Sequence, residues 1–307
     1  MQPGDLPAVL EVLRRSLGET AVLQRTPELW NWKHELNPFG RSLVLLAWLD
    51  GKVAGVRALM RWDLITPAGE TLRCLRAVDT ATDPDFKRRG IFSTLTRAAV
   101  EQATTDGYDM IFNTPNQASG PGYLKMGWTE VGRIGVMARP LLRTGVEVGD
   151  EALPDPEDFF AAPVVPAGSP LEDRHPLGLR TPRTADYSKW RFAGHPNARY
   201  REVATDSGVA IVRPNVRSGR KELVISELAG ERPASAVRRV SRIARARYIA
   251  AWFSPGSPER RAAVAGGVLP VPGMKALTLV ANPLRELPVD VTAIDTWDLS
   301  LGDLELL

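Results

Sequence analysis

The sequence predicts an α/β fold, with a mixed, mostly antiparallel sheet and flanking helices, that occurs twice along the chain. The first observation behind this prediction is the order of elements in the first half, where antiparallel hairpins lead into a strand–helix–strand unit. The second is a series of residues in the second half that match residues of the first half in the same order. At 307 residues, the chain is also long enough to bury two cores.

Turn residues and apolar periodicity locate the elements of the first half. An amphipathic helix is expected to begin at Gly4-Asp5-Leu6 and to end at about Leu17. The residues Asp50-Gly51 separate expected strands at 42–49 and 53–59, because this pair readily adopts the positive φ angles of a tight hairpin turn. Further along we expect a turn near 67–69, strands at about 72–80 and 108–113, and a helix at about 91–105 between those strands.

The second half resembles a diverged repeat of the first half. Trp32 and Pro38 match Trp190 and Pro196. In the next group, Asp50, Val53, Ala54, Val56 and Arg57 match Asp206, Val209, Ala210, Val212 and Arg213. Tyr108, Phe112 and Gly127 match Tyr248, Trp252 and Gly267. Finally, Ala138, Pro140 and Leu141 match Ala281, Pro283 and Leu284. We therefore expect a first domain at 1–141, a proline-rich linker at 142–180 and a second lobe at 181–307. The last segment, 297–307, could add a strand to either sheet.

The composition argues against several kinds of site. The chain has one cysteine, Cys74, and three histidines, so neither a disulfide within the chain nor a metal site is expected. Cys74 lies on a predicted strand and is expected to be a small buried apolar residue, not a nucleophile. No apolar run approaches the roughly 20 residues that span a bilayer, so we expect no membrane segment and a cytoplasmic location.

The positive charge of the chain says little about its partners. The formal charge is +3, and the densest basic stretch is 238–247, where arginines surround a predicted helix that also carries Val237, Val240 and Ile243. This stretch fits either a nucleic-acid face or the solvated face of an amphipathic helix. The second is favoured, because no aromatic side chains alternate with the arginines to stack on bases. A nucleic-acid partner is therefore not expected, and nothing in the sequence indicates an oligomer.

The segment 83–93 leaves a predicted strand and enters a predicted helix. The first amides of a helix have no partner within it and carry the positive end of its dipole, so this position suits a phosphate or pyrophosphate. Gly90 lets a ligand approach the backbone closely, and Lys87, Arg88 and Arg89 add positive charge. Taken alone, the loop fits a basic turn with an ordinary helix start equally well.

A second motif follows the next strand and consists of Asn116, Ser119, Tyr123, Lys125, Gly127 and Trp128. Together with the basic loop, it resembles the GNAT family, the Gcn5-related N-acetyltransferases, over about residues 80–128. In that family the loop reads Arg/Gln-x-x-Gly-x-Gly/Ala, and the later motif reads Asn-x-x-Ala-x-x-x-Tyr-x-Lys-x-Gly-Phe. Here Lys87 replaces the Arg or Gln, and Phe92 replaces a small residue. Gly120-Pro121-Gly122 should also shorten or break the helix that this segment usually forms, so Tyr123 is expected on the first turn of a short helix.

The resemblance implies a coenzyme site and a general acid. Tyr123 would protonate the thiolate that leaves when an amine attacks a thioester, and Asn116 would help to hold the coenzyme. The alternative for Tyr123 is a ring packed on the sheet with its hydroxyl satisfied. By the same resemblance, the carbonyl of the thioester would be polarised by a strand N–H near Ala81. Acetyl-CoA, or another acyl-CoA, would contact Thr80, Ala81, Thr82, Lys87, Arg88, Arg89, Gly90, Ile91, Phe92, Ser93, Asn116, Ser119 and Tyr123.

Other polar residues are candidates for the acceptor side of the reaction. Asp79 ends the strand before the basic loop, where the family often places a carboxylate or a water-holding residue, so it is either a general base or a structural carboxylate. Trp32, His34 and Glu35 lie in a region that borders the acceptor site in the family and are candidate substrate residues, although a core position is the default for Trp32. Near the C-terminus, the remaining candidates are Asp303 and Glu305, which could reach this site only if the last segment returns to the first lobe.

These expectations combine into one function. The chain is predicted to transfer an acetyl group from acetyl-CoA to a primary amine, of a small molecule or an amino sugar, by direct attack and without an acyl-enzyme intermediate. The second lobe has Ala263 where the first has Tyr123, and it lacks a comparable basic loop, so it is expected to keep the fold without the chemistry. Two alternatives stay open, namely transfer to a lysine of a protein or peptide and a non-catalytic acyl-CoA-binding module.

Overall fold

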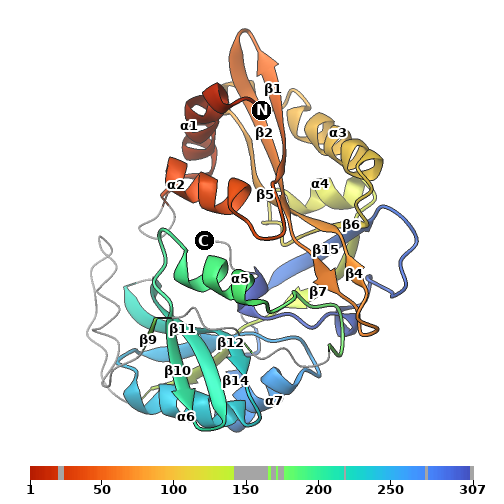
Figure 1. Cartoon of the computed structure of the whole chain (residues 1–307). Coiled ribbons are helices and arrows are strands. Elements are labelled where there is room, and N and C mark those ends of the chain that lie inside the picture. The colour runs from red at the N-terminus through yellow and green to blue at the C-terminus, as the bar shows by residue number, and fades with distance from the viewer. Residues whose placement is uncertain are drawn as a thin grey trace. The chain divides into compact units, whose positions relative to one another are not determined.

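The computed structural model describes residues 1–19, 24–141, 165–166, 171, 176–217, 219–273 and 276–304. The chain forms two compact units (Figure 1). Unit 1 comprises Met1–Gly132 and Thr278–Thr296, and unit 2 comprises Arg133–Leu277 and Trp297–Leu307. Each unit contains a mixed, mostly antiparallel sheet with helices packed on it, which confirms the predicted fold class.

Unit 1 is built on a six-stranded sheet with the order β1-β2-β5-β6-β15-β7. The strands are β1 (Leu43–Leu49), β2 (Lys52–Arg61), β5 (Cys74–Thr82), β6 (Met110–Asn113), β15 (Leu277–Pro283) and β7 (Thr129–Ile134). The helices are α1 (Leu6–Leu17), α2 (Pro27–Trp30), the π-helical turn η2 (Asn31–Glu35), α3 (Ile91–Thr105) and α4 (Gly120–Lys125). Two short strands, β3 (Leu64–Ile65) and β4 (Thr71–Leu72), form a separate hairpin, and η1 (Pro3–Asp5) and η3 (Pro84–Phe86) are 3-10 turns.

The elements of unit 1 form where local sequence signals place them. Asp50 and Gly51 have φ angles of 52° and 71°, and β1 pairs with β2 across this turn, so the predicted hairpin is confirmed. The apolar stripe of α1 packs on one face of the sheet and that of α3 on the other (Figure 1). Nearly every side chain of β2 is buried, because both of its faces are covered.

The two central strands of unit 1 pair over only part of their length. β5 and β6 are parallel and in register from Cys74 opposite Met110 to Arg76 opposite Phe112. β5 then continues to Thr82, whereas β6 ends at Asn113. The β6 side of the last part of β5 therefore lacks a partner from that strand.

Unit 2 is built on a seven-stranded sheet with the order β14-β8-β13-β12-β11-β10-β9. The strands are β14 (Leu269–Pro270), β8 (Met137–Pro140), β13 (Tyr248–Ala251), β12 (Arg220–Ala229), β11 (Gly208–Arg217), β10 (Arg201–Thr205) and β9 (Val165–Pro166). The helices and helical turns are α5 (Ala185–Ser188), η5 (Lys189–Ala193), α6 (Pro233–Ile243), α7 (Pro258–Ala265) and α8 (Leu301–Leu304), whereas the 3-10 turn η6 (Ile294–Thr296) belongs to unit 1. Arginines line the exposed side of α6, and its apolar side is buried.

The two units repeat the same local plan, as the matched residues predict. Each contains a short helix capped by a threonine, since Thr26 accepts a hydrogen bond from the amide of Leu29 and Thr184 accepts one from the amide of Tyr187. Each of these helices continues into a π-helical turn, which is an uncommon feature to find twice. The sheets are also ordered alike, with β2, β5 and β6 of unit 1 corresponding to β11, β12 and β13 of unit 2.

The units exchange one strand, which the sequence analysis does not predict. β8 follows β7 directly in sequence but pairs with β13 in the sheet of unit 2. β15 follows the elements of unit 2 but pairs with β6 in the sheet of unit 1. The compact units are therefore not the continuous segments 1–141 and 181–307. A strand pattern in a sequence indicates a strand but does not identify the strand with which it pairs.

Two other expectations concern segments between and after the lobes. The predicted linker, 142–180, lies largely outside the described residues, although Val165–Pro166 within it pairs with β10. The expectation that 297–307 adds a strand to a sheet is wrong for the part that is described. Trp297 and Ser300 form only isolated bridges, to Leu179 and Phe253, before α8 begins.

Within the described part of the chain, no helix is long and apolar enough to cross a membrane. The same residues contain no group of three or more His, Cys, Asp or Glu side chains arranged to hold a metal ion. Cys74 is buried, as its position on a predicted strand suggests.

The strand exchange predicts that residues 1–141 are a poor folding unit. This fragment lacks β15, whose Leu279 and Val280 are buried at 0% and 1% exposure. Losing these two side chains removes about 3 kcal/mol or more of apolar burial and leaves the edge of β6 unpaired. Circular dichroism and thermal unfolding should show a fragment that is largely unfolded or self-associated.

The matched control is residues 1–136 joined through a short Gly/Ser linker to 276–296, which restores β15. This chimera should show a cooperative unfolding transition. If the 1–141 fragment unfolds as cooperatively as the chimera does, β8 has replaced β15, and the exchange is not needed for the fold of unit 1.

Candidate active site

The basic loop of unit 1 has an unusual backbone. Arg88 and Gly90 both have left-handed φ angles, of 62° and 76°, and Gly90 is the residue that caps α3. Such angles favour glycine, so Gly90 meets a backbone requirement of this loop. The preceding turn is held by Asp83, whose carboxylate accepts hydrogen bonds from the amide of Asp85 at 2.9 Å and from Arg15 at 2.7 Å.

The start of α3 presents backbone donors beside exposed cations. The amide of Thr94 makes the hydrogen bond to the carbonyl of Gly90 at 3.0 Å, so the amides before it precede the first helical bond. The side chains of Lys87, Arg88 and Arg89 are exposed next to these amides. The arrangement therefore suits an anionic group such as a pyrophosphate.

Phe92, which stands where the resembled family has a small residue, packs against α4. Its ring meets that of Tyr123 edge to face, with the ring centres 5.4 Å apart. A Cβ atom at Gly122 would lie 2.9 Å from this ring, so a glycine at that position makes room for it. The large side chain is accommodated by contact with the neighbouring helix.

Tyr123 is buried at 1% exposure on the short helix α4. The helix has only six residues, with Pro121 in its first turn, as the sequence Gly120-Pro121-Gly122 predicts. The hydroxyl oxygen of Tyr123 accepts a hydrogen bond from Nη1 of Arg57 at 2.6 Å. The ring also contacts Trp128, with the ring centres 4.7 Å apart. Tyr123 is therefore both packed in the core of unit 1 and held at its hydroxyl.

Arg57 connects Tyr123 to the part of β5 that extends beyond β6. Its Nη1 atom also donates to the hydroxyl of Thr80 at 2.9 Å, and Thr80 donates to the carbonyl of Val78 at 3.2 Å. The register of β2 and β5 shifts here, since Val56 is opposite Ala81 and Ala58 is opposite Val78. Two residues of β5 thus oppose one residue of β2, which is the arrangement of a β-bulge.

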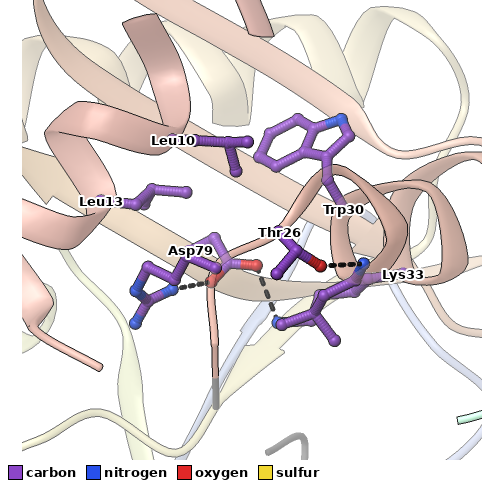
Figure 2. Close-up of a pocket in the computed structure, with 8 residues that line it drawn as sticks. Leu10, Leu13, Thr26, Trp30, Lys33 and Asp79 are labelled. Carbon is purple, nitrogen blue, oxygen red and sulfur yellow. Dashed lines mark hydrogen bonds and ion pairs between the residues drawn. The ribbon is translucent and has the colours of Figure 1, made fainter. Parts of the chain in front are cut away.

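Asp79 is the other residue of this bulge and has a left-handed φ of 39°. Its carboxylate pairs with Arg25 at 3.0 Å and with Lys33 at 2.9 Å, and it lies 3.1 Å from Nε2 of His34. Figure 2 shows the two cationic partners of Asp79 at a small pocket that is also lined by Leu10, Leu13 and Trp30. The pocket lies between α1, α2 and the bulge.

Electrostatics keep Asp79 ionised. Burial alone would raise the pKa of its carboxyl group, but the charge of Lys33, the hydrogen bond from His34 and the charge of Arg25 outweigh it and hold the pKa well below its ordinary value. Burial lowers the pKa of His34 against the opposing effect of Asp79, so the ring is neutral at pH 7. Because the ionised carboxylate of Asp79 can only accept, the proton of the neutral ring is assigned to Nε2, which donates to Asp79, and Nδ1 accepts from the hydroxyl of Ser42 at 2.8 Å.

The structure brings some of the predicted site residues together and separates others. Thr80, Phe92 and Tyr123 belong to one contact group around Arg57. Asp79 and His34 belong to a second group, the charged cluster that Asp79 forms with Arg25, Lys33 and His34. Ala81 and Thr82 continue along β5, and Ile91 and Ser93 lie in the first turn of α3, so both pairs flank the contact group in sequence.

The remaining predicted residues lie elsewhere in unit 1. Asn116 is exposed, and its side-chain oxygen accepts hydrogen bonds from the amides of Ala118 and Ser119 at the start of α4. Trp32 is buried at 4% exposure. Glu35 is on the surface and pairs with Arg41 at 3.0 Å. The two hydrogen bonds that Asn116 accepts give it a local role in shaping the turn before Tyr123.

Sequence reasoning missed Arg57, Arg25 and Lys33 as members of the site. One signal existed for Arg57, since a single arginine interrupts the apolar strand 53–60 and recurs as Arg213 in the second copy. Arg25 has a similar counterpart, because Arg25 and Arg183 each precede the threonine that caps the short helix leading into a π-helical turn. Only the fold shows which carboxylates they meet.

Unit 2 also contains a buried arginine paired with carboxylates. There Arg183 pairs with Glu227 at 2.9 Å and with Asp303 at 2.8 Å. Glu227 also lies next to a register shift, between β11 and β12. Asp303 therefore belongs to the interior of unit 2, and Glu305 lies outside the described residues. Ala263, in the place of Tyr123, is buried and has no hydroxyl to offer.

Comparison with known proteins supports this description. Residues 1–131 match the family model described as Acetyltransferase (GNAT) domain, which confirms for these residues the resemblance that their motifs indicate. No curated protein matches the sequence.

Solved structures share the fold of both units. A GCN5-related N-acetyltransferase from Anabaena variabilis is 11% identical with a TM-score of 0.60, and the match covers 92% of this chain and 71% of that one. A GCN5-related N-acetyltransferase from Kribbella flavida is 16% identical with a TM-score of 0.58 over the same shares of the two chains. A tandem GNAT protein from the clavulanic acid biosynthesis pathway is 15% identical with a TM-score of 0.52, and 94% and 97% of the chains are covered. At these identities the likeness describes the fold, and the tandem protein matches the duplicated architecture.

The cluster around Asp79 predicts a large effect of a single neutral substitution. Asp79→Asn leaves Arg25 and Lys33 buried without their counter-charge, and should lower the free energy of unfolding at pH 7 by about 3 kcal/mol. Denaturant unfolding at constant pH measures this difference. Glu35→Gln is the control, because its pair with Arg41 is exposed and should change stability by less than about 1 kcal/mol.

The same cluster predicts how stability depends on pH. Since the folded pKa of Asp79 lies below its unfolded value of about 3.9, its contribution is present above that pH and is lost as the pH falls below it. Asp79→Asn should therefore flatten the loss of stability between about pH 5 and the acid limit of folding. An acid dependence that is unchanged in this variant would contradict the assigned ionisation.

Proposed function

We propose that this chain is an acyl-CoA-dependent N-acyltransferase that moves an acetyl group from acetyl-CoA to a primary amine of a small molecule or amino sugar. The observation that carries the proposal is a set of contacts in unit 1. Tyr123 touches Phe92 in the first turn of α3 and, through Arg57, is joined to Thr80 in the part of β5 that extends beyond β6. An anion-binding helix start, a free strand edge and a phenol thus meet at one place.

The coenzyme would bind across these three parts. Its pyrophosphate would lie on the amides from Arg88 to Ser93, with the charges of Lys87, Arg88 and Arg89 around it. Its acyl-bearing arm would then run along the free edge of β5 at Thr80–Thr82, where a backbone N–H near Ala81 would polarise the thioester carbonyl. Asn116 and Ser119 would border the arm from the turn before α4.

The reaction would proceed by direct attack. The amine nitrogen bonds to the thioester carbon, the carbon–sulfur bond breaks, and the departing thiolate takes the proton of the Tyr123 hydroxyl. The nitrogen loses a proton to solvent, and a proton from solvent restores the tyrosine. No metal takes part in these steps.

The acceptor would enter on the side of α2 and η2. Asp79 carries a low pKa and three partners, so it is a weak proton acceptor, and the proposal gives it the task of fixing the bulge and the neighbouring pocket. Trp32 and His34 would support the wall of this entrance from the interior. Glu35 would lie at its surface rim, where it could meet an ammonium group.

Tyr123→Phe tests the chemistry of the proposal. This variant keeps the ring packing but removes the proton donor, so kcat should fall by roughly 100- to 10,000-fold. Thiol release from acetyl-CoA, followed against a panel of amines, amino sugars and lysine peptides, measures the rate and identifies the acceptor class. If only lysine peptides respond, the acceptor is a protein. Binding of acetyl-CoA with no turnover of any acceptor in the wild type would favour a binding module.

Gly90→Ala tests the coenzyme site. A Cβ atom at this glycine meets no neighbour, so the substitution acts through the left-handed φ of 76°, which disfavours alanine by about 1 kcal/mol. The altered loop should weaken acetyl-CoA binding, as measured by calorimetry. Gly69→Ala is the matched control, because Gly69 has a φ of 83°, equally open surroundings and a place in a distant turn. Equal affinities of the two variants would argue against the loop as the coenzyme site.

A further inference from the structure

Arg57 is a charged side chain in an apolar environment. It is 1% exposed, and its neighbours in β2, Val56 and Ala58, are completely buried. Removing a guanidinium group from water is costly unless hydrogen bonds and an opposite charge compensate for it. The partners of Arg57 therefore indicate why this cation is kept in the core of unit 1.

The partners of Arg57 are neutral. Its Nη1 atom donates to the hydroxyls of Tyr123 and Thr80, and its guanidinium lies 5.1 Å from the ring centre of Tyr123 and 5.8 Å from that of Phe92. Among the side chains that the structure describes, no carboxylate forms an ion pair with Arg57, and its buried Nε atom has no acceptor. The buried Arg25, in the same unit, does have a carboxylate partner. Arg57 thus holds an uncompensated positive charge beside a phenol.

The hydrogen bond to Tyr123 has a direction that matters for proton transfer. Arg57 can only donate, so the phenol oxygen is the acceptor in their 2.6 Å contact. The hydroxyl proton of Tyr123 must then point to some other acceptor, and within the described structure no side chain or backbone oxygen receives it. The phenol is therefore held with its proton available for donation.

We propose that Arg57 is a positioning residue for acyl transfer, which holds the hydroxyl of Tyr123 and neutralises the phenolate that forms when this tyrosine protonates the leaving thiolate. The inference rests on the proposed function and adds a residue that its motifs do not contain. When the carbon–sulfur bond breaks, the sulfur gains the electron pair and takes the proton from the Tyr123 oxygen. The negative charge that this leaves on the oxygen meets the guanidinium that is already bonded to it.

Thr80 completes the arrangement. It accepts from the same Nη1 atom that serves Tyr123, and it lies at the bulge of β5. The charge of Arg57 is thereby fixed between the tyrosine and the free strand edge. Because the group is already in place before the reaction, stabilising the phenolate requires little reorganisation.

A double-mutant cycle separates this role from a purely structural one. Arg57→Met should lower kcat by roughly 10- to 100-fold, the loss expected for one hydrogen bond to a charged group, and should leave KM for acetyl-CoA within about twofold. Arg57→Lys, which keeps the charge, should recover part of this loss. In the Tyr123→Phe background, Arg57→Met should change kcat by less than about twofold, because the phenolate that it would neutralise no longer forms.

Arg213→Met is the matched control. Arg213 occupies the corresponding place in unit 2 and is buried at 2% exposure, but Ala263 stands where unit 1 has Tyr123. This variant should leave kcat unchanged, whatever its effect on thermal unfolding. If Arg57→Met does not fold, Arg57→Lys with and without Tyr123→Phe provides the comparison.

The outcomes distinguish this inference from the proposed function. A wild type that releases no thiol with any amine overturns both. A wild type that turns over, together with equal effects of Arg57→Met in the wild-type and Tyr123→Phe backgrounds, overturns the inference alone. An unchanged kcat in Arg57→Met overturns it as well, whereas a coupled loss supports it.

Discussion

The bulge of β5 opposite Arg57 is the constraint on which the candidate site depends. In a regular strand, Asp79 and Thr80 would each face a residue of β2, and the pairing would continue without a shift. The extra residue instead directs Asp79 to the charged cluster and Thr80 to Arg57. The left-handed φ of Asp79 costs about 1 to 2 kcal/mol, which its contacts with Arg25, Lys33 and His34 offset.

The bulge adjoins two buried charged groups, the ion pair of Arg25 with Asp79 and the arginine Arg57 that contacts Tyr123, and the two differ when the units are compared. Arg25 with Asp79 and Arg183 with Glu227 are both buried ion pairs, so each unit contains a pair of this kind. The phenol that Arg57 holds has no counterpart, because unit 2 carries Ala263 in its place. A buried ion pair that occurs in both units is explained by stability, whereas the contact of an arginine with a phenol is confined to unit 1 and is better explained by chemistry. This contrast supports a structural role for Asp79 and a functional one for Tyr123.

The sequence predicts the parts of the fold that local interactions determine. The hairpin at Asp50-Gly51, the start of α3 after Gly90 and the short helix that carries Tyr123 each depend on a few neighbouring residues, and the structure has them in the expected places. The motifs likewise lead to the basic loop and the tyrosine. The partners of Asp79 and the position of Arg57 depend on contacts between distant segments, which one sequence without a fold does not specify.

The exchange of β8 and β15 also depends on contacts between segments that are distant in sequence. Through it, the second half of the chain contributes a strand to the sheet of unit 1. β15 pairs with β6, and β6 leads through Asn113 into the turn and helix that carry Tyr123. A second copy without its own basic loop or tyrosine would therefore still be required, because its chain supplies a strand to the sheet on which the candidate site is built. Loss of the second copy would remove that strand, so retention of the fold without the chemistry follows from how the sheets are assembled.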